Sequence, residues 1–307
     1  MQVAVVGAGV IGAGWAARFV LHGHNVKMFD LQTNAYAQAR AILAQAQAAH
    51  ESLYGGAPVI GELTFCDSLE DCVENTDWVQ ECLPERLDLK QSLFVQLAGL
   101  VLPNTIVASS TSGYTPSTLL AEQTSLSQQF MVAHPFVPVY LIPLVELVAH
   151  PNCLPDHLTK AQTELRAVNM HPLLVKKEID AHIADRLLEA VWREALWLVK
   201  DDVATTADID EAIKYGFGLR WAQMGLFETY RLGGGEGGMQ HFLQQFGPAL
   251  QLPWSKLTDV PEMDNELINK ISEQSDAQAA GKSIGEMTQQ RDANLVAILK
   301  ALRVSQA

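Results

Sequence analysis

The sequence predicts an α/β domain with a doubly wound, mostly parallel sheet, followed by an all-helical domain. Three features predict it: a glycine-rich turn near the start, an alternation of short apolar strands with helices, and the loss of strand patterns after Ala181. The chain has 307 residues, which is enough for two domains with sizeable cores. We expect the first domain over residues 1–178 and the second over residues 179–307.

The glycine-rich turn lies within the first fifteen residues. An apolar run over 3–6 breaks into Gly7-Ala8-Gly9-Val10-Ile11-Gly12 and continues as an alanine-rich helical stretch. Gly7 permits a tight turn, Gly9 lets the backbone approach a pyrophosphate, and Gly12 lets the helix pack closely on the strand. The N-terminus of the helix then directs free N–H groups at the anion. This is the Rossmann-type arrangement that binds a dinucleotide; a glycine turn that binds nothing is the alternative.

Asp30 indicates which dinucleotide is bound. It ends a second apolar run over 25–29, where a carboxylate binds the ribose hydroxyls of NAD and repels the 2′-phosphate of NADP. Leu31 and Gln32 follow it, so these neighbours offer no arginine to such a phosphate. The predicted cofactor is therefore NAD.

The rest of the first domain alternates strands and helices. An alanine- and glutamine-rich helix is expected over 33–53 and ends at Gly55-Gly56-Ala57-Pro58. Pro103 stops a helix over 86–102, another helix begins near Pro116, and a further one covers 158–168. Short apolar runs predict strands over 63–66, 77–82, 105–109, 129–133, 144–148 and 173–176. Such alternation is typical of a largely parallel sheet covered on both faces.

Helical spacing of apolar residues dominates from residue 183 onward. The first helix of this part runs to about Lys200, and others are expected over about 207–214, 221–231, 236–246, 262–274 and 283–302. An all-helical domain of this kind must bury wide apolar faces. We therefore expect it to form a homodimer interface.

The composition excludes several classes of partner. The formal net charge of −14 argues against nucleic acid and anionic membranes. No apolar run reaches the length of a membrane span, and the first residues are typical of a strand rather than a signal peptide. The four cysteines, at positions 66, 72, 82 and 153, show no CxxC spacing. We expect free thiols in a cytoplasmic protein, with neither a metal site nor disulfides.

His134 and Glu146 are the predicted catalytic pair. Removing a hydride from an alcohol requires a base for the hydroxyl proton, and histidine titrates near working pH. His134 follows an expected strand, in the region where open α/β sheets bind ligands. Glu146 is the lone acid of an apolar strand, where a buried carboxylate needs a partner such as histidine. A packed or surface histidine, and a salt bridge or sheet-edge position for Glu146, are the alternatives.

The spacing of His134, Pro138 and Glu146 resembles the active-site segment of the short-chain 3-hydroxyacyl-CoA dehydrogenase family. The glycine loop, Ser110-Thr111-Ser112 and Ile183-Ala184-Asp185-Arg186-Leu187 match the same family in the same order, so the resemblance spans essentially the whole chain. It implies that His134 is the catalytic base, that Glu146 is its partner, and that Ser112 bonds substrate and nicotinamide. It also implies that Glu85 and Lys90 lie near the ribose of the cofactor.

Two residues depart from that family's pattern. Members that act on hydroxyacyl-CoA carry asparagine where this chain has Val137 and Asp185. Their region corresponding to residues 33–53 is lysine-rich and contacts CoA phosphates, whereas here it contains no lysine. These departures argue against a thioester substrate.

Within the family, the helical domain most resembles the branch that oxidises L-carnitine, at residues 216–225 and 227–229. Carnitine is a small 3-hydroxy acid whose quaternary ammonium cannot donate a hydrogen bond, so aromatic faces and acids should hold it. The candidates for this contact are Asp185, Trp192, Phe217 and Trp221, and Arg193 or Arg220 is the candidate for the carboxylate. Core packing and surface salt bridges are the alternative roles.

Two classes of alternative remain for the function. The first is a dehydrogenase of another 3-hydroxy acid, such as L-gulonate, or of 3-hydroxyacyl-CoA. The second is a non-catalytic NAD-binding protein of the lambda-crystallin kind. A storage role would require none of Ser112, His134 and Glu146, which argues against the second class.

Overall fold

The computed structural model describes residues 1–32, 34–54, 59–121, 123, 125–252, 254–255, 264–287, 290 and 301. The chain divides into two compact units, Met1–Leu187 and Leu188–Ala307. The division falls near the start of the long helix α7 (Ala184–Lys200), so the first unit includes the residues that lead into this helix.

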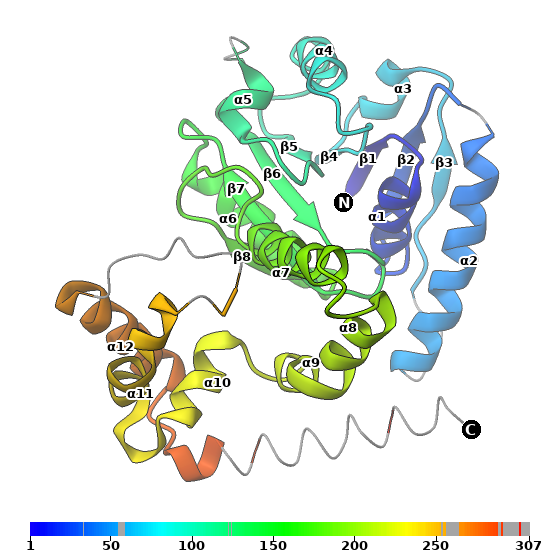
Figure 1. Ribbon diagram of the computed structural model, residues 1–307. Helices are drawn as coiled ribbons and strands as arrows, with labels where there is room; N and C mark the ends of the chain where they lie inside the picture. Colours follow the sequence, from blue (N-terminus) through cyan, green and yellow to red (C-terminus); the bar gives the residue numbers. More distant parts are fainter. Residues whose placement is uncertain are drawn as a thin grey trace. The chain divides into compact units, whose positions relative to one another are not determined.

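The first unit contains an eight-stranded sheet in the order β3-β2-β1-β4-β5-β6-β7-β8 (Figure 1). Neighbouring strands are parallel except β6 and β7, which are antiparallel. The strands are β1 (Gln2–Val6), β2 (Asn25–Phe29), β3 (Leu63–Phe65), β4 (Trp78–Glu81), β5 (Ile106–Ser109), β6 (Phe130–Pro135), β7 (Leu144–Ala149) and β8 (His171–Leu174). The predicted doubly wound, mostly parallel sheet is confirmed, and its strand order reverses between β1 and β4.

Helices cover both faces of this sheet. They are α1 (Val10–Val20), α2 (Ala35–Tyr54), α3 (Leu69–Val73), α4 (Leu87–Leu97), α5 (Pro116–Leu120) and α6 (Pro155–Ala167). One core cluster joins α1, α2 and α6 to Val3 and Val5, and the other joins α3, α4 and α5 to Ala4 and Val6. Because successive side chains of a strand point to opposite faces, these clusters lie on the two sides of the sheet. Central strands buried on both faces read as continuous apolar runs, as the sequence shows.

The strand boundaries differ from the expected ones where the sheet turns antiparallel. The expected strand over 129–133 extends as β6 to Pro135, so His134 lies within the strand rather than after it. Its continuation is stabilised by pairing with β7, which places His134 directly opposite Glu146. The last strand, β8, lies slightly earlier than the predicted 173–176.

The regular elements among the described residues of the second unit are all helical, as predicted. After α7 come α8 (Thr206–Ala212), a π-helical turn (Ile213–Phe217), α9 (Gly218–Trp221), α10 (Leu226–Gly233), α11 (Gly238–Phe246) and α12 (Asn265–Ala279), with 3-10 turns at Gly235–Gly237 and Gly247–Gln251. The single helix expected over 221–231 is two helices, because the chain turns at Gly225 before α10 begins. Most of the helix expected over 283–302 lies outside the described residues.

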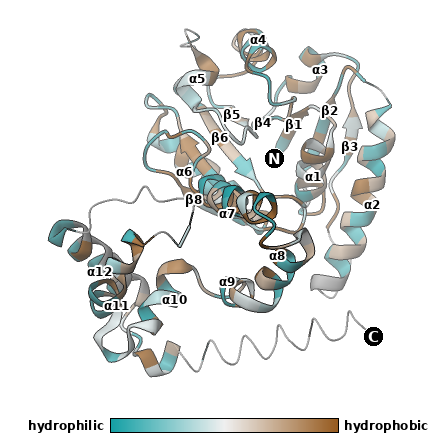
Figure 2. Ribbon diagram, in the orientation of Figure 1, coloured by the Kyte–Doolittle hydropathy of each residue, from teal (hydrophilic) through white to brown (hydrophobic). Residues whose placement is uncertain are grey.

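Helices of membrane-spanning length and hydropathy are absent from the described ranges. The longest helix of the first unit, α2, mixes hydrophobic and hydrophilic residues along its length (Figure 2).

Replacing Gly12 by Ala should destabilise the first unit. A Cβ atom at Gly12 would lie 1.9 Å from the carbonyl oxygen of Gly7, and backbone atoms cannot move aside without displacing β1 or α1. We expect the free energy of unfolding to fall by about 1–3 kcal/mol, despite the better helix propensity of alanine. Urea unfolding measures it. Gly9→Ala is the matched control, because its Cβ would meet nothing within 4 Å; equal stability of the two variants would contradict the packing argument.

Candidate functional site

The glycine loop follows the carboxyl end of β1, at the point where the strand order reverses. Gly7 has φ +105°, and a Cβ atom there would lie 2.5 Å from the carbonyl oxygen of Cys82. Gly9 is the N-cap of α1, and no side chain caps the helix. Val10 is exposed, so the first turn of α1 is open to an anion. The loop therefore fits the pyrophosphate of a dinucleotide.

Asp30 is bound to this loop. Its Oδ2 accepts a hydrogen bond of 2.7 Å from the N–H of Ala8, and its Oδ1 accepts one of 2.7 Å from the N–H of Gln32. These bonds fix the carboxylate at the end of β2, and its remaining lone pairs suit the hydroxyls of a ribose. The geometry fits the adenosine side of NAD.

A buried ion-pair network lies at the carboxyl ends of β4 and β5. The Glu81 carboxylate is fully buried and accepts hydrogen bonds from Lys90 Nζ (2.7 Å) and the N–H of Leu83 (2.6 Å), as well as from the hydroxyl of Ser109. Lys90 Nζ also lies 3.3 Å from Glu85 Oε2. Burial raises the pKa of the Glu81 carboxyl, and the charge of Lys90 opposes that rise. Lys90 thus neutralises part of the charge of two carboxylates.

Glu85 connects this network to the loop that carries Ser112. Its Oε1 accepts hydrogen bonds from the Thr111 hydroxyl and from the N–H groups of Ser112 and Gly113, the latter two at 3.1 Å. Burial alone would raise the pKa of Glu85, but the Thr111 hydroxyl and Lys90 bring it below its usual value, so Glu85 is ionised. Ser112 itself is exposed. The expected cofactor residues Glu85 and Lys90 and the expected catalytic Ser112 therefore lie in one connected group.

His134 and Glu146 form a hydrogen bond across the antiparallel strand pair. His134 Nδ1 lies 3.0 Å from Glu146 Oε2, and both side chains are buried. Glu146 Oε1 accepts hydrogen bonds of 2.9 Å from the N–H groups of Ile183 and Ala184. Burial raises the pKa of Glu146, but His134 and these two N–H groups outweigh it and lower the pKa below its ordinary value. An ionised Glu146 therefore holds His134 with Nδ1 as donor, and leaves Nε2 for chemistry.

The start of α7 brings a second carboxylate to the same histidine. Asp185 Oδ2 lies 3.6 Å from His134 Nε2, so the structure unites three of the predicted site residues. His182, which the sequence did not single out, is fully buried, and its ring centroid lies 5.5 Å from that of His134. Burial, together with the nearby His134, lowers the pKa of His182. The sequence feature that could have pointed to His182 is its position directly before the segment over 183–187 that matches the family.

The aromatic residues expected at the substrate fall into two places in the second unit. Phe217, Arg220 and Trp221 line one hollow together with Leu226, Thr229 and Tyr230, and the rings of Phe217 and Trp221 are 4.6 Å apart. Trp192 lies on α7, is exposed, and is not among the residues that line this hollow. The structure thus gathers three of the four expected residues of this unit.

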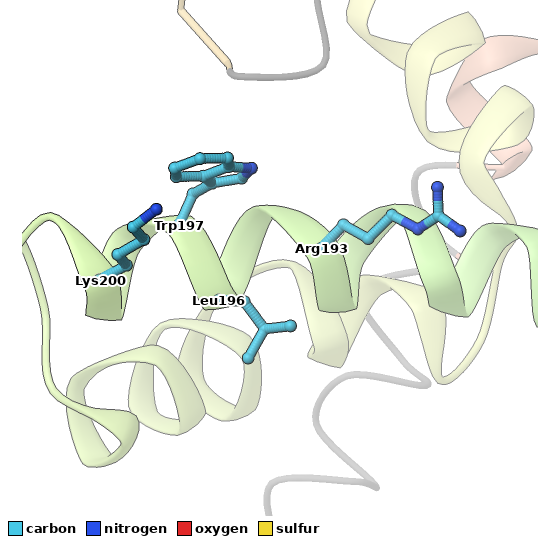
Figure 3. A pocket seen from close by; sticks show the side chains of 4 residues that line it. All are labelled: Arg193, Leu196, Trp197 and Lys200. Carbon is cyan, nitrogen blue, oxygen red and sulfur yellow. The ribbon is translucent and has the colours of Figure 1, made fainter.

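A second hollow of this unit is lined by Arg193, Leu196, Trp197 and Lys200, all of which come from α7 (Figure 3). Lys200 Nζ lies 4.4 Å from the ring centroid of Trp197. Of the residues expected at the substrate, this hollow contains Arg193, the alternative to Arg220 as partner of the carboxylate. The four cysteines are free thiols.

Two family models match successive parts of the chain. Residues 2–179 match the model of 3-hydroxyacyl-CoA dehydrogenase, NAD binding domain, and residues 182–267 match that of its C-terminal domain. The chain is 51% identical over 306 residues to L-carnitine dehydrogenase/betainyl-CoA thioesterase of Agrobacterium fabrum (strain C58), covering 99% of this chain and 62% of that protein. It therefore spans less than two thirds of that relative's length.

Two further matches cover almost the whole of both chains. An L-carnitine dehydrogenase of a Pseudomonas species is 46% identical over 306 residues, which cover 99% of this chain and 94% of that protein. The crystal structure of 5-formyl-3-hydroxy-2-methylpyridine 4-carboxylic acid 5-dehydrogenase, an NAD+ dependent dismutase, is 25% identical with a TM-score of 0.76 and covers 98% of each chain.

Replacing His182 by Asn should flatten the pH dependence of folding stability below pH 7. Its pKa is lowered from 6.5 in the folded state, so the unfolded chain binds a proton that the folded chain refuses as pH falls. Stability is then lost by up to about 1.4 kcal/mol for each pH unit between the two pKa values. Asparagine removes the titrating ring and tolerates the local φ of +51°.

Urea unfolding of both proteins at pH 7.5, 6.5 and 5.5 measures this effect. Burial also lowers the pKa of His22, His24 and His150, so the difference between the two proteins isolates His182. Identical slopes of stability against pH would show that His182 is not the group responsible.

Proposed function

We propose that this chain, which belongs to the 3-hydroxyacyl-CoA dehydrogenase family, oxidises the 3-hydroxyl of L-carnitine to the ketone of 3-dehydrocarnitine with NAD⁺. Its first unit is the NAD-binding domain of that family. The observation that carries the reaction type is the buried hydrogen bond between His134 and Glu146, next to the partly exposed Asp185. The names of the relatives support the choice of substrate.

His134 acts as the general base in this proposal. Because Nδ1 is bonded to Glu146, the hydroxyl proton of the substrate moves to Nε2, the C–O bond becomes a carbonyl, and the carbinol hydrogen leaves with its electron pair. NAD⁺, when bound, supplies the acceptor for that hydride. Glu146 stabilises the imidazolium and keeps the ring in one tautomer, as carboxylate partners of catalytic histidines do.

The residues that hold the cofactor follow from the loop and its neighbours. The Gly7–Gly12 loop, including Ala8, Val10 and Ile11, receives the pyrophosphate, and Asp30 receives the adenosine ribose. Glu85 fixes the backbone of the loop that carries Ser112, whose exposed hydroxyl we assign to the substrate and nicotinamide. Lys90 is buried between Glu81 and Glu85, which favours a positioning role; we keep contact with a ribose as a prediction.

The same site argues against the competing functions. A non-catalytic NAD-binding protein would not need Glu146 to fix one tautomer of His134, with Nε2 turned to a substrate. An acyl-CoA substrate carries phosphate groups. The segment over 33–53, most of which forms α2, contains no lysine to bind them. We retain Trp192, Phe217, Arg220 and Trp221 as proposed substrate contacts, with the functional boundary between domains at residue 178.

We also propose that the protein forms a homodimer and acts in the cytoplasm. Four apolar residues recur at helical spacing on α7, and each is between 39% and 59% exposed: Leu188, Trp192, Leu196 and Val199. Figure 2 shows hydrophobic residues along this helix between hydrophilic ones. A second copy of the chain would cover this face. Free cysteines suit a reducing compartment.

Replacing Leu196 by Glu should shift the protein toward the monomer by at least about tenfold in dissociation constant, since it places a charge in the apolar face. Analytical ultracentrifugation at micromolar concentration measures the shift. Glu189→Gln, at an exposed position of the same helix, is the control. A wild-type protein that sediments as a monomer would contradict the proposal.

Replacing His134 by Gln should lower kcat for L-carnitine by at least about 10³-fold, because glutamine can bond Glu146 but cannot accept the proton. NADH formation followed by absorbance measures turnover, and NADH fluorescence titration should show cofactor affinity within about twofold of wild type. Unchanged turnover would contradict the role of His134.

The same assay discriminates the substrate. L-carnitine, 3-hydroxybutyryl-CoA and L-gulonate are offered to the wild-type protein side by side, and we expect kcat/KM to be highest for carnitine. A higher kcat/KM for either of the others would assign a different dehydrogenase. NADH binding without turnover of any of the three would favour the non-catalytic function.

A further inference from the structure

His134 lies between two carboxylates of different character. Glu146 Oε2 is 3.0 Å from Nδ1 and is fully buried, with both of its oxygens engaged by hydrogen-bond donors. Asp185 Oδ2 is 3.6 Å from Nε2, and its side chain keeps 24% of its surface exposed. Asp185 therefore places a negative charge beside the nitrogen that takes the proton, within reach of a ligand.

The route of the proton determines which part of a substrate comes near Asp185. The hydroxyl must approach Nε2 within hydrogen-bond distance, about 2.6–3.2 Å. Because Asp185 Oδ2 lies 3.6 Å from the same nitrogen, substituents on the carbon next to the carbinol carbon reach the neighbourhood of this carboxylate. In L-carnitine one of the two carbons next to the carbinol carbon bears the trimethylammonium group, which the charge of Asp185 attracts, and the other bears the carboxylate, which it repels.

The other groups that the described part of the chain places against His134 do not supply this charge in an accessible form. Glu146 is enclosed, and Phe136, whose ring centroid is 4.9 Å from that of His134, is uncharged. Burial lowers the pKa of His182, so this ring is neutral near pH 7. Asp185 combines a negative charge with exposure.

Resting on the proposed function, we propose that Asp185 is a specificity-determining residue that selects substrates carrying a cation on the carbon next to the carbinol carbon. A quaternary ammonium has no N–H to donate, so an opposite charge or an aromatic face must attract it. Asp185 thus favours the binding of a cationic substrate.

A pair of substrates that differ only in charge tests this role. L-Carnitine and 3-hydroxy-5,5-dimethylhexanoate of the same configuration have nearly the same shape, because a carbon atom replaces the ammonium nitrogen. The measurement is the ratio of their kcat/KM values in wild type, Asp185→Asn and Asp185→Glu. We expect wild type to prefer carnitine, Asp185→Asn to lose at least about tenfold of that preference, and Asp185→Glu to keep part of it.

Glu189→Gln is the matched control, since it removes an exposed carboxylate one turn further along α7. It should leave the ratio as in wild type. If Asp185 only positions His134, both substrates will slow together and the ratio will not change, which overturns the inference. The inference is also overturned if Asp185→Asn oxidises carnitine normally and keeps the wild-type ratio. Aromatic side chains would then be the groups that bind the ammonium. Absence of carnitine oxidation in wild type would overturn the proposed function itself.

Discussion

The first unit depends on how the Glu146 carboxylate is satisfied. An isolated buried carboxylate is strongly unfavourable, so this one persists because His134 and the N–H groups of Ile183 and Ala184 all donate to it. These three donors come from β6 and from the turn that begins α7. One side chain therefore ties the antiparallel strand pair to the start of the long helix, and that tie orients the base and brings Asp185 to its other nitrogen.

The cofactor side of the site is held by a comparable arrangement of charges. Glu81 and Glu85 both form ion pairs with Lys90, and Glu85 accepts a hydrogen bond from the N–H of Ser112. Ser110, in the same loop, accepts hydrogen bonds from Trp15 of α1 and from the Gln80 side chain of β4. The loop is thus fixed from α1, β4 and α4 together, and a change in any of them would reach the residue assigned to the nicotinamide.

Much of the fold and part of the site could be predicted from the sequence, because local patterns determined them. The glycine loop, the alternation of elements and Asp30 each follow from rules about neighbouring residues. The contact between His134 and Glu146 was expected from chemical need, but the antiparallel register that produces it depends on how β6 and β7 pair. The placement of Asp185 and His182 could not be predicted, because both follow from the path of the chain after β8. Burial of Lys90 also depends on tertiary packing, which its sequence neighbours do not show.

The charges around His134 favour a substrate that carries a cation. Before proton transfer, a neutral imidazole lies between two carboxylates, so the immediate surroundings carry two negative charges. The transferred proton makes the imidazole positive, which compensates one of these charges. Glu146, which is bonded to Nδ1, forms the closer ion pair with the resulting imidazolium. The carboxylate of Asp185 lies 3.6 Å from Nε2, the nitrogen that the substrate hydroxyl approaches. A substrate that brings its own cation to that position is attracted by the carboxylate of Asp185, whereas a neutral thioester is not.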